Sequence, residues 1–206
     1  LARQYYEQGA DEIAFLNMGL AGFVLSAVCT RFVYPAVSTE GRSYWILRSS
    51  PLGLKRFMWG KYLLFLLPML VLGEVLIVLT NYLLEVTPFM MGLTTATTGL
   101  MVLGILALGI GLGAMYPNFE HENIAQVSTG FGGLLYMMLS ALYIGLIIIL
   151  EAGPVYLLFM AQVRGDPLSP LDWVFVTASF VAVVGISLSA IFKPMKKGLA
   201  QLEKME

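Results

Sequence analysis

The residues that could do chemistry in this chain are few and lie far apart. Glu74 falls within a long apolar segment, Cys29 is the single cysteine and His121 is the single histidine. One cysteine cannot form an intrachain disulfide, and a histidine with no second histidine or cysteine nearby does not make a metal site. We therefore expect no catalytic residue and no metal site in this chain.

Glu74 is the outstanding polar residue of the apolar segments. A carboxyl group near the bilayer centre costs roughly 3 kcal/mol on insertion scales, and the surrounding leucines offset that cost. The side chain must face protein or water, so we expect Asn17, Asn81 or a threonine hydroxyl between residues 94 and 98 to pair with it. Two interpretations stay open: a group that relays protons or binds substrate, and a protonated acid hydrogen-bonded between helices.

Segment 38–50 combines aromatic and basic residues at helical spacing, with Tyr44 one turn before Arg48. Ser50 followed by Pro51 is a typical helix start, with the serine as N-cap. The pattern predicts a short cytoplasmic helix, a break and a second helix that leads into the membrane. Chemistry alone allows an interfacial helix at the lipid headgroups or a docking element for a cytoplasmic partner.

The composition determines which elements must position these residues. Of 206 residues, 58% are hydrophobic and 12% are charged, and the mean hydropathy is +0.81. A polar surface cannot be assembled around such a chain, so we expect an integral membrane protein. The net charge of -1 provides no electrostatic footprint for nucleic acid.

Five segments are long and apolar enough to cross a bilayer, which takes about 20 residues. They are residues 13–34, 61–84, 89–115, 124–150 and 173–192. A shorter apolar stretch, 155–163, is bracketed by glycines and prolines and predicts a short outer interfacial or re-entrant helix. The predicted fold class is therefore an all-α polytopic membrane helix bundle, with residues 1–206 as a single transmembrane domain.

The distribution of lysine and arginine predicts the orientation. Ten of the 12 basic residues flank or lie between the first two spans or follow the last span. Basic residues favour the cytoplasmic side, so we expect the N-terminal end outside and the C-terminal end in the cytoplasm.

Two runs in the sequence resemble a known family. The first extends from Glu40 to Pro51 (EGRSYWILRSSP), and the second covers 111–119 (GLGAMYPNF), followed by Glu122 and Asn123. They resemble the permease subunits of bacterial ATP-binding-cassette (ABC) exporters of type-2 architecture, over about residues 15–197. That family has six spans, so the resemblance implies a C-terminal fragment of a longer permease in the bacterial cytoplasmic membrane, with 38–50 as its coupling helix.

The resemblance also implies a function, namely an exporter permease that converts the ATP-driven motion of a separate ATPase subunit into substrate translocation and is not itself an enzyme. The implied partners are that ATPase, a second permease half or identical copy, and the lipid bilayer, and ATP and Mg²⁺ are expected on the ATPase rather than in this chain. The sequence contains no G-x-x-x-x-G-K-[ST] motif, which agrees with that placement. The expected ATPase-coupling residues are Glu40, Gly41, Arg42, Trp45, Arg48 and Pro51. The expected secondary cytoplasmic contacts are Pro117, Phe119, Glu120 and Glu122.

The residues also allow an alternative function. A secondary transporter or channel fragment would use Glu74 as a proton or ion site and would need no ATPase. Proton-dependent flux that is lost in Glu74→Gln would favour this alternative.

Overall fold

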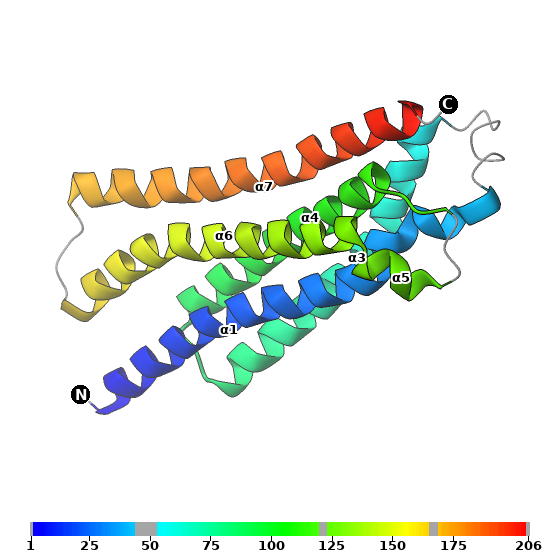
Figure 1. The fold of residues 1–206 in the computed structure, drawn as a ribbon. Helices are drawn as coiled ribbons and strands as arrows, with labels where there is room; N and C mark the ends of the chain where they lie inside the picture. The colour runs from blue at the N-terminus through cyan, green and yellow to red at the C-terminus, as the bar shows by residue number, and fades with distance from the viewer. Residues whose placement is uncertain (1, 44–52, 120–122, 165–168, 205–206) are drawn as a thin grey trace.

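The computed structural model describes residues 2–43, 53–119, 123–164 and 169–204. Figure 1 shows long helices running side by side, with short helices at one end of the bundle. The long helices are α1 (Ala2–Phe32), α3 (Leu54–Leu83), α4 (Pro88–Met115), α6 (Phe131–Arg164) and α7 (Pro170–Lys204). The short ones are η1 (Tyr34–Ala36), η2 (Ser38–Ser43) and α5 (Ile124–Thr129).

Five helices in the described parts of the chain are long and apolar enough to cross a membrane. Those parts are helical and contain no strand. The predicted fold class, an all-α polytopic membrane bundle, is confirmed. That residues 1–206 form a single domain stays a prediction.

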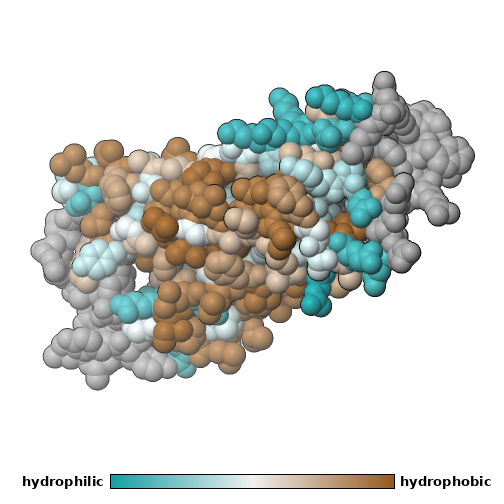
Figure 2. All heavy atoms as spheres, in the orientation of Figure 1, coloured by the Kyte–Doolittle hydropathy of each residue, from teal (hydrophilic) through white to brown (hydrophobic). Residues whose placement is uncertain are grey.

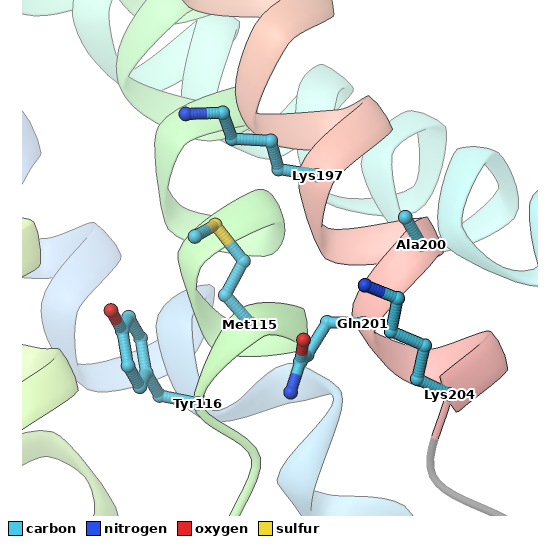
Figure 3. A pocket seen from close by; sticks show the side chains of 6 residues that line it. All are labelled: Met115, Tyr116, Lys197, Ala200, Gln201 and Lys204. Atoms are coloured by element: carbon cyan, nitrogen blue, oxygen red, sulfur yellow. The ribbon is translucent and has the colours of Figure 1, made fainter.

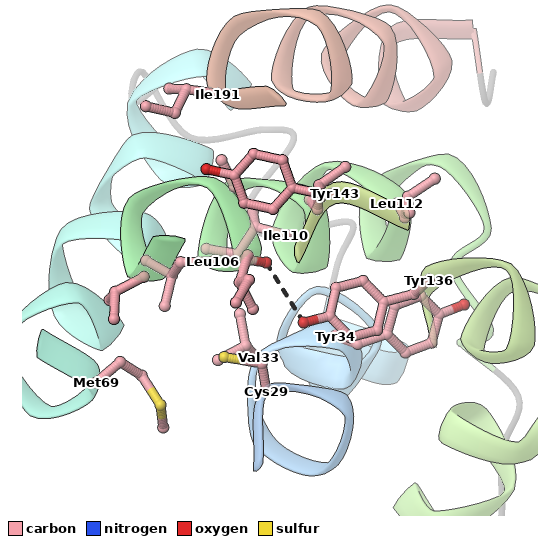
Figure 4. Close-up of a cluster of buried hydrophobic side chains, with 14 of the residues drawn as sticks. Cys29, Val33, Tyr34, Met69, Leu106, Ile110, Leu112, Tyr136, Tyr143 and Ile191 are labelled. Atoms are coloured by element: carbon pink, nitrogen blue, oxygen red, sulfur yellow. Dashed lines mark hydrogen bonds between the residues drawn. The ribbon is translucent and has the colours of Figure 1, made fainter. Parts of the chain in front are cut away.

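Helix α4 is the centre of the bundle and the most enclosed of the five helices. The side chains of Met101, Ile105, Leu106 and Ile110 are completely buried, and α1, α3, α6 and α7 all pack on this helix. Figure 4 shows Leu106 and Ile110 within the same cluster as Val33, which follows α1, and Tyr136 of α6. A helix that is apolar on nearly every face can be buried at the centre of a bundle, which is where α4 lies.

The outer faces of the peripheral helices remain apolar. On α3, the side chains of Leu63, Leu64, Leu67, Val71 and Val75 are each more than half exposed. In Figure 2, apolar side chains cover the middle of the visible face, and hydrophilic side chains gather toward the end where α7 finishes. A band of this kind faces lipid in a membrane protein, so these leucines need no protein partner.

Glycines set the closest helix contacts in the structure. A Cβ added to Gly111 of α4 would lie 2.6 Å from the carbonyl carbon of Pro194, and one added to Gly198 of α7 would lie 2.5 Å from the carbonyl oxygen of Gly111. Gly109 and Gly113 also make close contacts, with Val33 and with the carbonyl oxygen of Tyr34 in η1, respectively. Small residues let two helix backbones approach in this way.

Two predicted elements differ in the structure. The stretch 155–163 is not a separate helix, because α6 continues through Gly153 and Pro154 to Arg164. A proline removes one helical hydrogen bond, and packing can compensate for that loss: Pro154 is buried, and Phe175 of α7 lies against Gly153. The predicted span 124–150 is instead divided at Gly130 into α5 and α6.

Candidate functional site

The basic residues of the described chain gather at one end of the bundle, which we call the cationic end. There α1, α4 and α7 finish and α3 begins (Figure 1). Its lysines and arginines in the helices are Arg31, Arg42, Lys55, Arg56, Lys61, Lys193, Lys196, Lys197 and Lys204. The predicted coupling residues belong to the short elements at this end.

An ion pair connects the first predicted coupling residue to a membrane helix. Glu40 of η2 places its Oε1 2.6 Å from Nζ of Lys61 on α3, and the same Nζ lies 5.4 Å from the centre of the Phe57 ring. The two charged side chains are only 26% and 21% exposed, respectively. Partial exposure limits the contribution of such a pair to stability to about 1 kcal/mol or less, so its main effect is to fix η2 relative to α3.

A second contact connects η2 to the end of α4. The backbone N–H of Asn118 donates a 3.0 Å hydrogen bond to Oγ of Ser38, which is completely buried. Gly41 has φ +50°, a left-handed conformation that favours glycine, and its Cα faces the carbonyl oxygen of Phe119. The structure therefore brings residues 38–43 of the predicted coupling segment beside residues 117–119, which include the predicted contacts Pro117 and Phe119.

The remaining predicted contact residues have different outcomes. Trp45, Arg48, Pro51, Glu120 and Glu122 lie outside the described residues. The backbone of Arg42 is part of η2, and Pro117 is half-buried. Phe119 packs against the hydrophobic core, so its ring anchors the loop after α4. That these residues contact a partner stays a prediction.

A cavity of about 460 Å³ lies between the end of α4 and α7 at the cationic end. Figure 3 shows the side chains of Met115 and Tyr116 on one side and of Lys197, Gln201 and Lys204 on the other. No prediction from the sequence included this cavity. The sequence feature that could have indicated it is the seven-residue spacing of Lys197 and Lys204, which puts both lysines on one face of a helix.

Glu74 does not have the partners predicted for it. Its Oε2 is buried without a hydrogen-bond partner in the structure, and the carboxyl lies beside Gly99, which offers no side-chain donor. Asn81 instead donates a 2.7 Å hydrogen bond to Oγ1 of Thr94, and Nδ2 of Asn17 is buried without a partner. The predicted pairing is wrong because α3 places Asn81 two turns beyond Glu74.

Glu151 is the buried carboxyl that the sequence analysis missed. Its side chain is 1% exposed, and Oγ1 of Thr97 on α4 donates a 2.8 Å hydrogen bond to its Oε1. Its Oε2 has no partner in the structure. The signal was the helical spacing of Tyr136, Ile144, Ile147 and Glu151, all on the buried face of α6. Ending the predicted span at residue 150 put this carboxyl outside the membrane.

A further carboxyl joins two helices at the opposite end of the bundle. Asp11 of α1 is 4% exposed and accepts hydrogen bonds from the backbone N–H of Thr87 at 2.9 Å and from its Oγ1 at 2.8 Å. Thr87 is the N-cap of α4, where a negative side chain interacts favourably with the helix dipole. Asp11 therefore fixes the start of the central helix against α1.

Comparison with known proteins identifies the family. The model of a family described as "Putative ATP-binding cassette" matches residues 8–206. No curated protein and no solved structure matches this chain.

This match corrects three predictions. The permease-subunit assignment, the exporter function built on it and the exclusion of an enzyme are contradicted, because the matching family is described by ATP binding. The alternative of a secondary transporter or channel gains no support from this family either. The assignment depended on the resemblance of two short runs, and composition and span pattern could not test it, because they report the solvent around the helices and not their role in an ATP cycle. The match covers nearly all of the sequence, so this membrane chain belongs to the putative ATP-binding cassette family and to an ABC transporter assembly.

Proposed function

We propose that an ATPase subunit of the ABC transporter assembly to which this membrane chain belongs contacts the chain at the cationic end. The proposed contact surface consists of η2 and the segment 116–119, with Trp45, Arg48, Pro51, Glu120 and Glu122 added from the sequence. The assembly would lie in the bacterial cytoplasmic membrane with the cationic end inside, and a second copy or a related chain would complete it.

One observation carries this proposal. η2 is attached to α3 by the ion pair between Glu40 and Lys61 and to the end of α4 by the hydrogen bond between Ser38 and Asn118. η2 is therefore attached to a peripheral membrane helix and to the end of the central one, so a partner that docks on η2 meets a surface that is fixed to the bundle.

In this arrangement ATP and Mg²⁺ would bind to the ATPase partner and not within the helix bundle. The phosphate-binding loop of ABC ATPases joins a strand to a helix and carries the G-x-x-x-x-G-K-[ST] motif, and this sequence does not contain that motif. The one Gly-Lys pair of the sequence, Gly60 and Lys61, lies within α3, and the next residue is Tyr62 rather than serine or threonine. Lys61 also pairs with Glu40.

Charge reversal at the ion pair tests the proposal in the complete assembly, reconstituted in liposomes. Glu40→Lys should lower the rate of ATP hydrolysis by the assembly several-fold, because two ammonium groups then repel each other between η2 and α3. Adding Lys61→Glu restores an attractive pair and should recover most of the rate. Glu203→Lys, which makes the same charge change at an exposed position of α7, should leave the rate unchanged.

Two outcomes would count against the proposal. Unchanged hydrolysis in Glu40→Lys, or an equal loss in Glu203→Lys, would show that the contact with the ATPase does not depend on the position in which this pair holds η2.

The cavity beside Lys197 and Lys204 supports a second candidate, direct ATP binding by this chain, since its volume falls in the usual range for ligand sites. Photolabelling of the isolated chain by azido-ATP that disappears in Lys197→Gln/Lys204→Gln would establish that candidate instead.

A further inference from the structure

A second cavity at the cationic end has the chemistry of a phospholipid site. It has a volume of about 190 Å³ and lies between the first turns of α3 and the last third of α7. Lys55 and Lys196 contribute its charged groups, and Met58, Trp59, Phe192 and Met195 contribute most of its apolar lining. Among the residues that the structure describes, no carboxylate lines this cavity.

The lining separates into a cationic part and an apolar part. Lys55 and Lys196 are exposed, whereas Met58 and Met195 are buried beneath them. The Trp59 and Phe192 rings lie with their centroids 6.4 Å apart, one from each helix. Cationic groups above an aromatic and thioether base match a phosphate above the glycerol and first methylenes of a lipid.

The position of the cavity selects a membrane lipid over a soluble anion. On α3, the exposed apolar residues begin at Leu63, two turns after Lys55, and continue through Leu67 and Val71. On α7, Phe192 is 54% exposed and is followed at once by the exposed Lys193. The cavity therefore lies at the boundary between the lipid-facing band and the charged end, which is the level of the headgroups.

We propose that this cavity binds the headgroup of an anionic phospholipid, with the phosphate between Lys55 and Lys196 and the start of an acyl chain against Trp59 and Phe192. The inference does not rest on the proposed function, because it uses only the cavity and its place along the bundle. Its occupant supplies a negative charge where the basic residues of the two helices converge.

Quenching of Trp59 fluorescence tests this site in the full chain. Trp45→Phe and Trp173→Phe leave Trp59 as the one tryptophan of the sequence. In mixed detergent micelles, brominated phosphatidylglycerol should quench Trp59 at a much lower mole fraction than brominated phosphatidylcholine. Lys55→Gln/Lys196→Gln should raise the mole fraction needed for half-maximal quenching by phosphatidylglycerol roughly thirtyfold, the combined effect of two lysines near an anionic surface.

The matched control removes the same charge from neighbouring positions. Arg56 and Lys193 are exposed residues of the same two helices and do not line the cavity. Arg56→Gln/Lys193→Gln should shift the quenching curve little, and equal melting temperatures of the two double variants would show that both fold. Equal quenching by both lipids, an equal shift in the control, or displacement of the lipid by millimolar inorganic phosphate would overturn the proposal, the last in favour of a free-anion site.

Discussion

At the scale of single residues, the polar interior of the bundle depends on a few threonine hydroxyls. Thr97 gives Glu151 its one hydrogen bond in the structure, and Thr94 accepts one from Asn81. Water is not available in the centre of a bilayer, so a buried carboxyl or amide that loses its partner bears the full desolvation cost. These threonines are therefore more important for stability than their surface counterparts.

Replacing Thr97 by valine tests this directly. Valine has nearly the same shape but cannot donate to Glu151, so Thr97→Val should lower the free energy of unfolding by about 1 to 3 kcal/mol. Thr177→Val is the control, because Thr177 is exposed and bonds only the Trp173 carbonyl of its own helix. Thermal melts in one detergent should show a lower midpoint for Thr97→Val alone. Equal midpoints would mean that the Thr97–Glu151 bond contributes nothing.

At the scale of the elements, α4 and α7 are held together by a contact of backbone on backbone. Gly198 faces the carbonyl oxygen of Gly111, and Gly111 in turn faces Pro194. In a membrane, helix association depends on such close packing, because lipid tails are as apolar as the side chains they replace. A methyl group added at this contact would meet backbone atoms, which cannot move aside as a flexible side chain can.

Gly198→Ala should therefore weaken the α4–α7 contact, with a cost of about 1 to 3 kcal/mol for forced overpacking. Gly185→Ala on the same helix is the control: nothing lies within 4 Å of the new methyl group, and alanine stabilises a helix relative to glycine. The melting midpoint should fall for Gly198→Ala and stay or rise for Gly185→Ala. A parallel change in both variants would assign the effect to helix propensity rather than to packing.

The elements show what the sequence could predict and what it could not. The third predicted span agrees with α4 to within one residue, because Thr87 and Pro88 start it and Pro117 follows its end. The extent of α6 was missed because Gly153 and Pro154 normally end a helix, and whether packing compensates cannot be seen locally. The Gly111–Gly198 contact could not be predicted, since both glycines lie in the sequence without any sign of which helix each faces.

The candidate site was predictable in its location and not in its contacts. The basic residues placed the cationic end correctly at the start of α3 and the end of α7. The pairing of Glu40 with Lys61 joins residues 21 positions apart on different elements, and no periodicity reports such a contact. The function of the whole chain was the property that the sequence predicted least well. An apolar composition identifies a membrane protein but does not indicate membership of a family described by ATP binding.

At the scale of the whole molecule, the two ends of the bundle differ in their charged groups. Of the described basic residues, nine belong to helices at the cationic end and only Arg3 and Arg164 to the other end. That other end carries buried and exposed acids that include Asp11, Glu85 and Asp172. Basic residues are retained on the cytoplasmic side during insertion, and acids have little influence on the choice. The bundle should therefore adopt one orientation only.

Labelling with a membrane-impermeant thiol reagent tests that orientation. Cys29 is 2% exposed, so the unaltered chain should react little and serves as the blank. Glu85→Cys, in the turn between α3 and α4, should react in intact cells, and Glu203→Cys, near the end of α7, should react only after the membrane is permeabilised. Labelling of Glu203→Cys in intact cells would reverse the assigned orientation. It would also remove the proposed nucleotide-dependent contact, because η2 and the end of α7 would then face away from cellular ATP.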